Sequence, residues 1–327
     1  MLKIGLLGVG HLGKIHLGLL LQLPEIFEVV GIYDVDQLNA LSVANEYNVK
    51  SFPNVEDLLM AVDCVDIVTP TLNHFSSASL ALRNRKHIFI EKPLSETLEE
   101  GKLLVQLAIE ADVVVQIGHV ERFNPAFQAA LPFLNNPMFI ETHRLAQFNP
   151  RGTDVPVVLD LMIHDIDTIL SVVKSNVKKI SASGVAIVSD SHDITNARIE
   201  FENGCVANLT ASRISLKNMR KSRFFQRDAY VGIDFLNKTL EVVRMQDLHG
   251  EPDPFDFIMD LGENKSKKKI LIDKPELAAT NAILEELKAF AFSIINKEPA
   301  KVTIDDGYYA MHVAYQIIDK LKENIIR

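Results

Sequence analysis

The 327-residue sequence has only two cysteines, Cys64 and Cys205, which lie far apart in the chain. Two cysteines at this spacing provide neither a disulfide framework nor a C-x-x-C metal motif. So few thiols fit a reducing compartment. We therefore expect a cytoplasmic protein without a structural metal.

Positive charge is also scarce, because 34 Lys and Arg stand against 43 Asp and Glu and give a formal net charge of -9. This balance does not favour a nucleic-acid partner. No apolar stretch reaches membrane-spanning length, so no membrane contact is expected. The apolar N-terminus could imitate a signal peptide, but Gly5, Gly8, Gly10 and Gly13 interrupt it. A glycine-rich nucleotide-binding motif explains it better.

What the chain does have is a regular alternation of apolar runs and helical segments over residues 1–120. The runs "LKIGLLG", "FEVVGIYD", "VDCVDIVTP", "HIFIEKP" and "DVVVQIG" are rich in Val and Ile and are joined by helical segments. Continuous apolar strands indicate a sheet covered by helices on both faces. The pattern predicts a doubly wound parallel sheet of the Rossmann type, an α/β fold.

The pattern changes after residue 120. A strand at "PMFIETHRLAQF" and a helix over 157–173 precede several long, alternating strands joined by turns such as "ENG". These strands predict a large, mostly antiparallel sheet. Two further helices, about 277–295 and 304–323, complete the chain. We expect an NAD-binding Rossmann domain over 1–120 and an α+β domain for substrate binding and oligomerisation over 121–327.

A glycine loop, Gly8-Val9-Gly10-His11-Leu12-Gly13, joins the first strand to the first helix. The three glycines provide a tight turn, close backbone approach to a pyrophosphate and close helix packing. Asp34 ends the second strand, where an acid binds the ribose hydroxyls of the cofactor. No basic residue follows Asp34 to pair with a 2′-phosphate, so the sequence favours NAD over NADP.

Polar residues stand where two further strands end. In a doubly wound sheet the ligand lies beyond the carboxyl ends of the strands. Lys92, within Glu91-Lys92-Pro93, is therefore expected near the nicotinamide. The residues that end the preceding strand are expected to form another wall of the cofactor crevice: Thr69, Pro70, Asn73 and His74.

The helix over 157–173 carries the second candidate group. Asp160 and His164 are four residues apart and therefore share one helix face. A histidine beside a carboxylate, with a lysine elsewhere, is the set that alcohol oxidation requires: a base, an orienting acid and a cation near the developing alkoxide. For Asp160 and His164 alone, an ordinary helix-surface pair is an equally good interpretation.

The sequence resembles the Gfo/Idh/MocA oxidoreductases over nearly the whole chain. The resemblance rests on the glycine loop, the "TP…H" strand end, "EKP" and the D-x-x-x-H helix, which occur in this order. The resemblance implies that Lys92 and His164 are the catalytic pair, with Asp160 in support. It also implies that Glu91 lines the nicotinamide end of the cofactor site.

Within this family, "GHVERFNPAF" and "LDLMIHDID" are similar to the UDP-N-acetylglucosamine 3-dehydrogenase branch. That similarity implies oxidation of the sugar 3-hydroxyl, followed by an aminotransferase that makes a 2,3-diamino sugar for lipid A. Arginine and lysine side chains could bind the diphosphate. Arg122 and Asn124, which directly follow the last Rossmann strand, and Arg213 are predicted substrate ligands. Arg144 and Arg223 fit structural ion pairs better.

Three alternatives remain from the sequence. An inositol or free-sugar dehydrogenase would share the motifs, and so would a dehydrogenase that acts on a UDP-sugar acid. The third is a non-catalytic regulator that senses a dinucleotide and a sugar. Intact Lys92, Asp160 and His164 favour the enzyme. The alternating strands of the second domain leave one sheet face that needs water or a partner, so we expect a homodimer or homotetramer.

Overall fold

The chain forms two compact units in a computed structural model that describes residues 1–149, 155–262 and 266–323. The first unit comprises Met1–Phe123 and Thr280–His312, and the second comprises Asn124–Ala279 and the residues from Val313 onward. Residues 280–312 therefore pack with the first 123 residues, although they follow the second sheet in sequence. None of the described helices is both long enough and apolar enough to cross a membrane.

The first unit contains a five-stranded parallel sheet, as the sequence predicts. Its strand order is β2-β1-β3-β4-β5, and a single parallel bridge between Ile32 and Ser51 extends the β2 edge. The strands are β1 (Leu2–Leu7), β2 (Phe27–Tyr33), β3 (Cys64–Ile67), β4 (His87–Glu91) and β5 (Val115–Gly118). The helices are α1 (His11–Leu20), α2 (Gln37–Tyr47), α3 (Val55–Ala61), α4 (His74–Arg83), α5 (Leu98–Ala111) and α8 (Ala282–Asn296).

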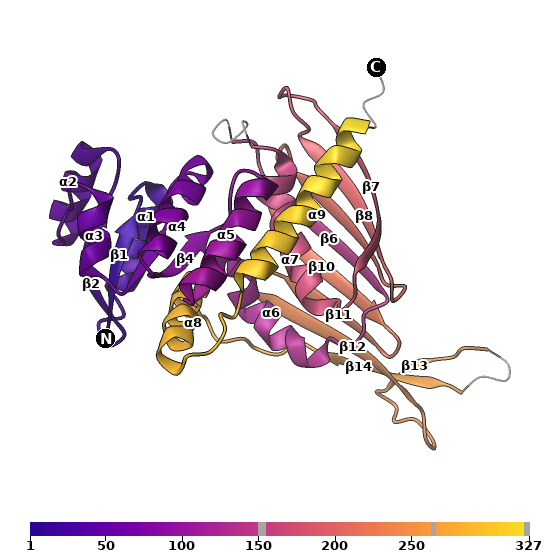
Figure 1. Cartoon of the computed structure of the whole chain (residues 1–327). Coiled ribbons are helices and arrows are strands. Elements are labelled where there is room, and N and C mark those ends of the chain that lie inside the picture. The colour runs from indigo at the N-terminus through magenta and orange to yellow at the C-terminus, as the bar shows by residue number, and fades with distance from the viewer. Residues whose placement is uncertain (150–154, 263–265, 324–327) are drawn as a thin grey trace. The chain divides into compact units, whose positions relative to one another are not determined.

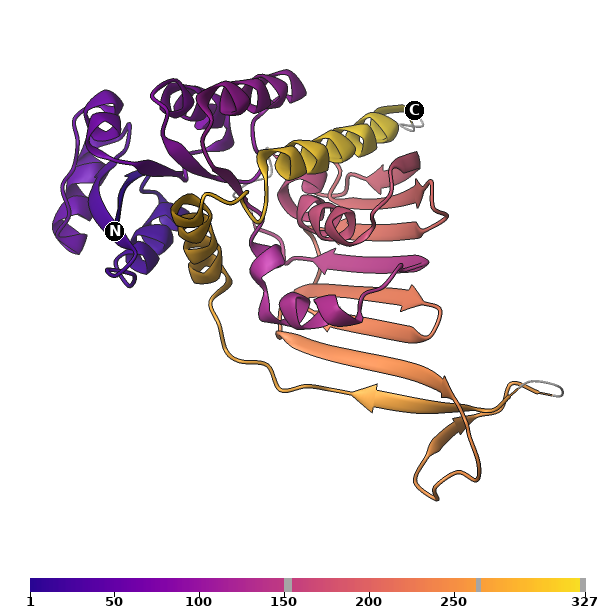
Figure 2. The same cartoon turned by 60° about the horizontal axis from the view of Figure 1, so that its bottom comes forward.

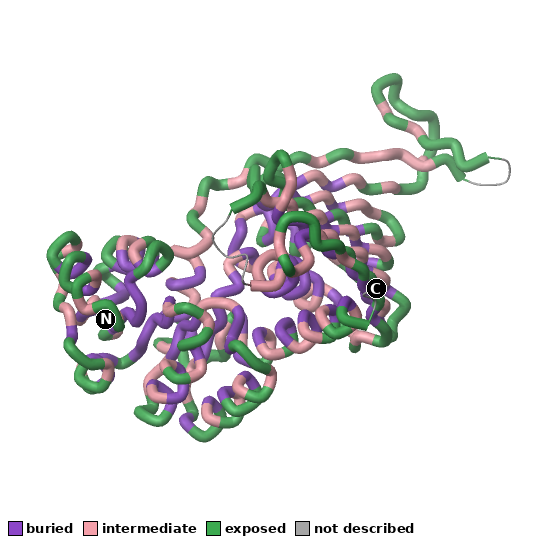
Figure 3. Tube along the Cα trace, turned by 90° about the horizontal axis from the view of Figure 1, so that it is seen from above, coloured by how far each residue is buried: buried purple, intermediate pink, exposed green. Residues whose placement is uncertain are grey.

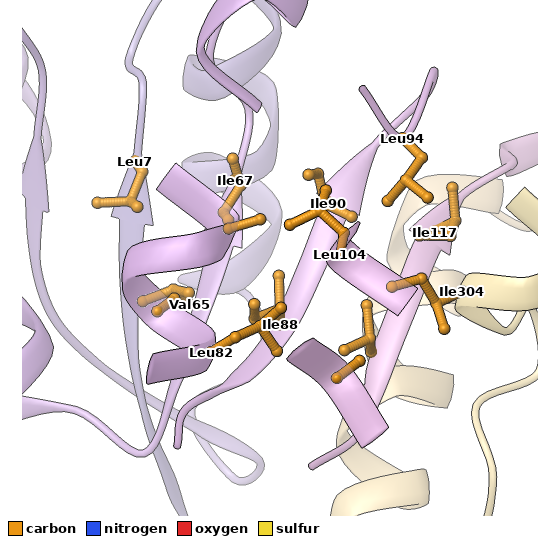
Figure 4. Packing of buried hydrophobic residues seen from close by; sticks show 14 of the residues in the cluster. Leu7, Val65, Ile67, Leu82, Ile88, Ile90, Leu94, Leu104, Ile117 and Ile304 are labelled. Atoms are coloured by element: carbon orange, nitrogen blue, oxygen red, sulfur yellow. The ribbon is translucent and has the colours of Figure 1, made fainter. Parts of the chain in front are cut away.

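Helices cover both faces of this sheet, which explains the continuous apolar runs. On one face, Val65, Ile67, Ile88 and Ile90 pack against α3, α4 and α5 (Figure 4). On the other face, Ile4, Cys64 and Phe89 pack against α1 and α8. Helix α5 begins with a capping box, in which Thr97 and Glu100 bond to each other's backbone N–H groups.

The second unit is built on a nine-stranded sheet that is antiparallel except at the β6–β9 pair. This confirms the predicted mostly antiparallel sheet. Its order is β13-β14-β12-β11-β10-β6-β9-β8-β7. The strands are β6 (Phe139–Leu145), β7 (Val177–Val185), β8 (Ile194–Phe201), β9 (Val206–Ser212), β10 (Met219–Gln226), β11 (Ala229–Asp234), β12 (Thr239–Asp247), β13 (Phe257–Met259) and β14 (Lys268–Asp273).

Among the described residues, helices lie on one face of this sheet only. The helices α6 (Pro125–Ala130) and α7 (Ile163–Val172) and the C-terminal part of α9 (Ile304–Glu323) occupy that face (Figures 1 and 2). Buried residues therefore alternate with half-buried or exposed ones along the strands (Figure 3). A short π-helical turn, Val158–Met162, leads directly into α7.

One buried ion pair attaches α7 to the sheet. Arg144 on β6 donates from Nε and Nη2 to the two carboxylate oxygens of Asp165 on α7, at 3.0 and 2.9 Å. Both side chains are only 3% exposed. This planar, two-bond geometry is the one for which arginine suits better than lysine. It fixes the helix that carries His164.

We predict that Arg144→Met will lower the free energy of unfolding by about 3–5 kcal/mol, because it leaves Asp165 buried without its counter-charge. The double variant Arg144→Met/Asp165→Leu should recover most of that loss. Urea unfolding followed by circular dichroism measures both. A double variant as unstable as the single one would show that the ion pair itself, not the unpaired charge, provides the stability.

Candidate active site

The glycine loop has the shape that the sequence predicts. Gly8 has a φ of +90°, and a Cβ there would lie 2.8 Å from the Val68 carbonyl oxygen. A Cβ on Gly13 would lie 2.1 Å from the carbonyl oxygen of Gly8. A Cβ on Gly10 would meet nothing within 4 Å. The fold therefore requires Gly8 and Gly13, whereas Gly10, together with the exposed His11 and Leu12, borders open space at the start of α1.

Asp34 supports the loop and borders a cavity. Its Oδ2 accepts the Val9 N–H at 2.8 Å and its Oδ1 accepts the Asp36 N–H at 2.9 Å. The adjoining cavity has a volume of about 240 Å³, and its lining includes five of the predicted cofactor residues: Gly8, Asp34, Thr69, Pro70 and Asn73. The buried Thr69 hydroxyl has no hydrogen-bond partner among the described residues.

His74 joins two loops of the first unit. Its side chain is buried, with Nδ1 2.8 Å from the Pro93 carbonyl oxygen and Nε2 2.9 Å from the Thr69 carbonyl oxygen. Burial lowers the pKa of His74, although the two carbonyls favour the protonated ring. The side chain holds the loop after β3 against the loop after β4. Its predicted direct contact with the cofactor stays a prediction.

Glu91 is the last residue of β4 and Lys92 follows it, with Gly118 on β5 opposite Glu91. Glu91 Oε2 accepts the Lys92 backbone N–H at 3.2 Å. A Cβ on Gly118 would lie 2.8 Å from the Glu91 carboxylate, so the glycine makes room for that group. The Lys92–Pro93 peptide is cis. Lys92 is partly buried at the carboxyl end of its strand, the position that the topology predicts.

Sequence reasoning missed a buried polar cluster behind Glu91. It comprises His16 on α1, Asp66 on β3, Gln116 on β5 and Glu286 on α8, all with side chains from the first unit. Each residue is 0% exposed. An acid within the apolar run "VDCVDIVTP" was the available signal, because Asp is almost never fully buried without a partner.

The second unit carries Asp160 and His164 as predicted on one helical segment. Asp160 lies in the π-helical turn, and His164 is the second residue of α7. A π-helical turn is wider than an α-helical one and is frequent at functional sites. Both side chains are partly buried. The Thr168 hydroxyl donates to the His164 carbonyl at 2.8 Å and the next residue, Asp165, bonds to Arg144, so the backbone that presents His164 is held on both sides.

The predicted substrate ligands have different surroundings. Arg122 lies 3.9 Å from Asp306, with its side chain 15% exposed. Asn124 caps α6: its Oδ1 accepts the Ala126 N–H at 3.1 Å and its Nδ2 donates to the Phe235 carbonyl at 3.0 Å. Arg213 is buried and donates to the carbonyl of Val155, beside the start of the π-helical turn. A substrate contact for each stays a prediction, and Asn124 already has a structural role.

The two arginines assigned to structural ion pairs are confirmed in that role. Arg144 bonds to Asp165, and Arg223 Nε lies 3.4 Å from Glu141 Oε2 on the neighbouring strand β6. The Arg223 side chain is 46% exposed, so its pair contributes little to stability.

Comparison with protein families identifies both parts of the chain. Residues 2–119 match the model described as "Oxidoreductase family, NAD-binding Rossmann fold", and residues 126–226 match the "GFO/IDH/MocA C-terminal domain". The chain belongs to the Gfo/Idh/MocA oxidoreductase family.

Individual relatives agree with this assignment. UDP-N-acetylglucosamine 3-dehydrogenase from Acidithiobacillus ferrooxidans is 40% identical over 242 residues, which are 74% of this chain and 76% of that protein. A solved structure of that enzyme has a TM-score of 0.90 at 33% identity and covers 100% of this chain and 99% of that one. The scyllo-inositol 2-dehydrogenase (NAD(+)) of Bacillus subtilis is 28% identical over 65% of this chain and 68% of its own length.

NAD is the cofactor of this Gfo/Idh/MocA chain, and the first unit fits it. Gly8, Gly10 and Gly13 would hold the pyrophosphate at the start of α1, and Asp34 would bind the adenosine ribose. Further contacts are available in the cavity beside Asp34 and at the Thr69 hydroxyl, which has no hydrogen-bond partner in the part of the chain that the structure describes.

We predict that Gly10→Ala will weaken NAD binding by about tenfold or more while the unfolding temperature stays near that of the wild type, because the new methyl group meets only bound pyrophosphate. Gly13→Ala is the matched variant and should destabilise the protein itself, because its methyl group would overlap the Gly8 carbonyl. Calorimetric NAD titration and thermal unfolding separate the two. Unchanged NAD affinity in Gly10→Ala would place the pyrophosphate elsewhere.

Proposed function

We propose that this chain is an NAD-dependent dehydrogenase that oxidises the 3-hydroxyl of UDP-N-acetylglucosamine. The observation that carries the proposal is the 40% identity to an enzyme of that name, over about three quarters of both chains. The similarity in structure over the full length, with a TM-score of 0.90, supports it. The chain also keeps the side chains that such a reaction needs.

In this proposal His164 is the general base. It removes the hydroxyl proton, and Asp160, four residues earlier, orients its imidazole and favours the charged form. Lys92 donates a hydrogen bond to the same oxygen and stabilises the negative charge that develops there. Bound NAD supplies a hydride acceptor. Two groups that act on one oxygen would explain why a lysine ends a buried strand, where its desolvation is otherwise costly.

Basic side chains would bind the diphosphate of the nucleotide sugar. Arg122 is the best candidate, since it is a basic side chain on the short helical turn that follows β5. Arg213 would act beside the π-helical turn that carries Asp160. We place the enzyme in the cytoplasm, where an aminotransferase would convert the 3-keto product into a 2,3-diamino sugar for lipid A.

The second candidate function is oxidation of an inositol or a free sugar. The 28% identity to the scyllo-inositol 2-dehydrogenase of Bacillus subtilis favours it, because the match covers about two thirds of both chains. It would use the same Lys92 and His164 on a different hydroxyl. A non-catalytic sensor on this fold is the third candidate, but it has no need of a base.

We predict that the wild type will reduce NAD with UDP-N-acetylglucosamine, followed by absorbance, and that Lys92→Met and His164→Ala will each lower turnover by about 100-fold or more. NAD affinity should change little in Lys92→Met, because the pyrophosphate and ribose are bound by other residues. The residual rate of His164→Ala should lose the dependence on an imidazole pKa.

The substrate panel and an arginine control make this test specific. Arg223→Met removes an exposed basic side chain that pairs with Glu141, and it should leave turnover unchanged. NAD reduction with inositols but with no UDP-sugar would keep the mechanism and replace the substrate. Near-wild-type turnover in both Lys92→Met and His164→Ala would reject the mechanism and favour the sensor.

We also propose that the helix-free face of the second sheet joins two copies of the chain. An aromatic cluster lies on this face: Phe225 has ring-centroid distances of 6.0 Å to Phe139 and 5.2 Å to Tyr230. Phe225 is 36% exposed, and the nearby Arg223 and Glu141 form an ion pair beside the aromatic cluster. Aromatic residues surrounded by a polar rim are typical of subunit interfaces, and a face shared by two copies gives a closed dimer.

We predict a dimer or tetramer mass in light scattering at micromolar concentration and a shift toward monomer in Phe225→Glu, because a buried carboxylate would have no partner in the interface. Leu38→Glu is the control, because Leu38 is 81% exposed on α2, outside this sheet. The light-scattering mass of this variant should match that of the wild type. A wild-type monomer would contradict the assembly and would leave the catalytic proposal standing.

A further inference from the structure

The polar cluster behind Glu91 lies on one face of the parallel sheet. Alternation along the strands places Asp66 beside Cys64, and Glu91 beside Phe89, on the face that packs against α1 and α8. Gln116 also points to α8, since its Nε2 donates to the Glu286 carbonyl at 2.7 Å. Apolar side chains could be buried at each of these sites with a lower cost in free energy. The polar side chains are therefore better explained by a functional role.

His16 lies between two carboxylates. Its Nδ1 is 2.9 Å from Asp66 Oδ2, a hydrogen bond, and its Nε2 is 3.3 Å from Glu91 Oε1, an ion-pair contact that is not aligned as a hydrogen bond. The ring is 0% exposed and packs its edge against Phe89, with centroids 5.8 Å apart. A carboxylate beside each ring nitrogen suits the positively charged imidazolium better than the neutral ring, in which one nitrogen carries no proton.

The charges around His16 favour the same state. Burial acts to lower the pKa of His16, but Asp66, with help from Glu91, outweighs burial and holds that pKa well above its usual 6.5. The nearby acids on other elements are Glu286 on α8 and Glu121 on η2 (Val120–Phe123). Burial, reinforced by Glu91, raises the pKa of Glu286 well above 4.5, which favours its neutral form beside His16, Asp66 and Glu91.

Glu91 connects this cluster to the candidate active site. Its side chain is 12% exposed, one carboxylate oxygen faces His16, and the other accepts the Lys92 backbone N–H. Gly118 leaves the space in which the carboxylate lies. A shift of the Glu91 carboxylate would therefore act directly on the backbone that carries Lys92.

We propose that His16 and Asp66 are positioning residues that hold the Glu91 carboxylate, and through it Lys92, in place at the carboxyl end of β4. Asp66 fixes the imidazolium through Nδ1. The imidazolium attracts one carboxylate oxygen of Glu91, while the Lys92 backbone N–H bonds to the other. The proposal rests on the proposed function in one respect: Glu91 and Lys92 must lie at the nicotinamide end of the cofactor site. It assigns no contact with cofactor or substrate to His16 or Asp66.

The charge state of His16 can be tested without cofactor or substrate. In the full-length protein with labelled histidine, nitrogen NMR at about pH 8, where an ordinary histidine with a pKa of about 6.5 is neutral, should show one ring with both nitrogens protonated. His16→Gln assigns that signal by removing it. Asp66→Asn should return the ring to the neutral form. A neutral His16 ring in the wild type would overturn the proposal.

The positioning role is tested by a double-mutant cycle between Asp66→Asn and Glu91→Gln, measured on NADH affinity and on the fluorescence of the bound reduced nicotinamide. Each single variant should weaken NADH binding by about three- to tenfold and change the emission, and the double variant should be no worse than Glu91→Gln alone. Turnover should follow the same non-additive pattern. Fully additive losses would mean that Asp66 acts independently of Glu91 and would overturn the proposal.

Phe290→Leu is the matched control for simple loss of stability. Phe290 on α8 is buried and packs edge-on against Phe89, with ring centroids 6.0 Å apart. Its apolar side chain makes no polar contact with His16, Asp66 or Glu91. It should lower the unfolding temperature without changing the emission of bound NADH. If Glu91→Gln alone had no effect on NADH, the role of Glu91 in the proposed function would fail, whereas the NMR result would still decide whether Asp66 holds His16 as an imidazolium.

Discussion

The parallel pairing of β1, β3 and β4 is the constraint on which the candidate site depends. In this register the three strands end at the same edge of the sheet, so Gly8, Thr69 and Lys92 come together although they are far apart in sequence. Hydrogen bonds then connect the loops that follow the strands. Asp34 bonds to the glycine loop, and His74 bonds to the loops after β3 and β4. A site assembled in this way needs no long loop to carry its polar groups.

Buried charge plays a different part in each unit. In the second unit Arg144 and Asp165 satisfy each other with two hydrogen bonds and attach α7 to β6. In the first unit His16 lies between two acids, and neither carboxyl oxygen of Glu286 has a hydrogen-bond partner among the described residues. The first arrangement is a structural connection. The second retains an imperfectly satisfied group, which proteins keep mainly near functional sites.

Much of this arrangement could be predicted from the sequence, because its signals are local. Continuous Val- and Ile-rich runs indicated the parallel sheet, and the strand ends indicated Lys92 and Thr69. The buried cluster could not be predicted in the same way, because it joins His16, Asp66 and Glu286 across 270 positions of the numbering, from 16 to 286. The packing of residues 280–312 with the first sheet has no local signal either. Asn124 is predicted as a ligand because it comes soon after β5, and that contact stays a prediction. Its structural role was not foreseen: Asn is a preferred N-cap, and its side chain caps α6.

The protons held in the cluster link it to stability. The pKa values of both His16 and Glu286 are raised in the folded protein, so the folded state binds more protons than the unfolded state above the usual values of 4.5 for Glu and 6.5 for His. Stability then falls as the pH rises from these values through the higher folded pKa of each group. An apolar core at these positions would be free of that dependence on pH. A polar cluster next to Glu91 is what we expect where the positioning of a functional group matters more than stability.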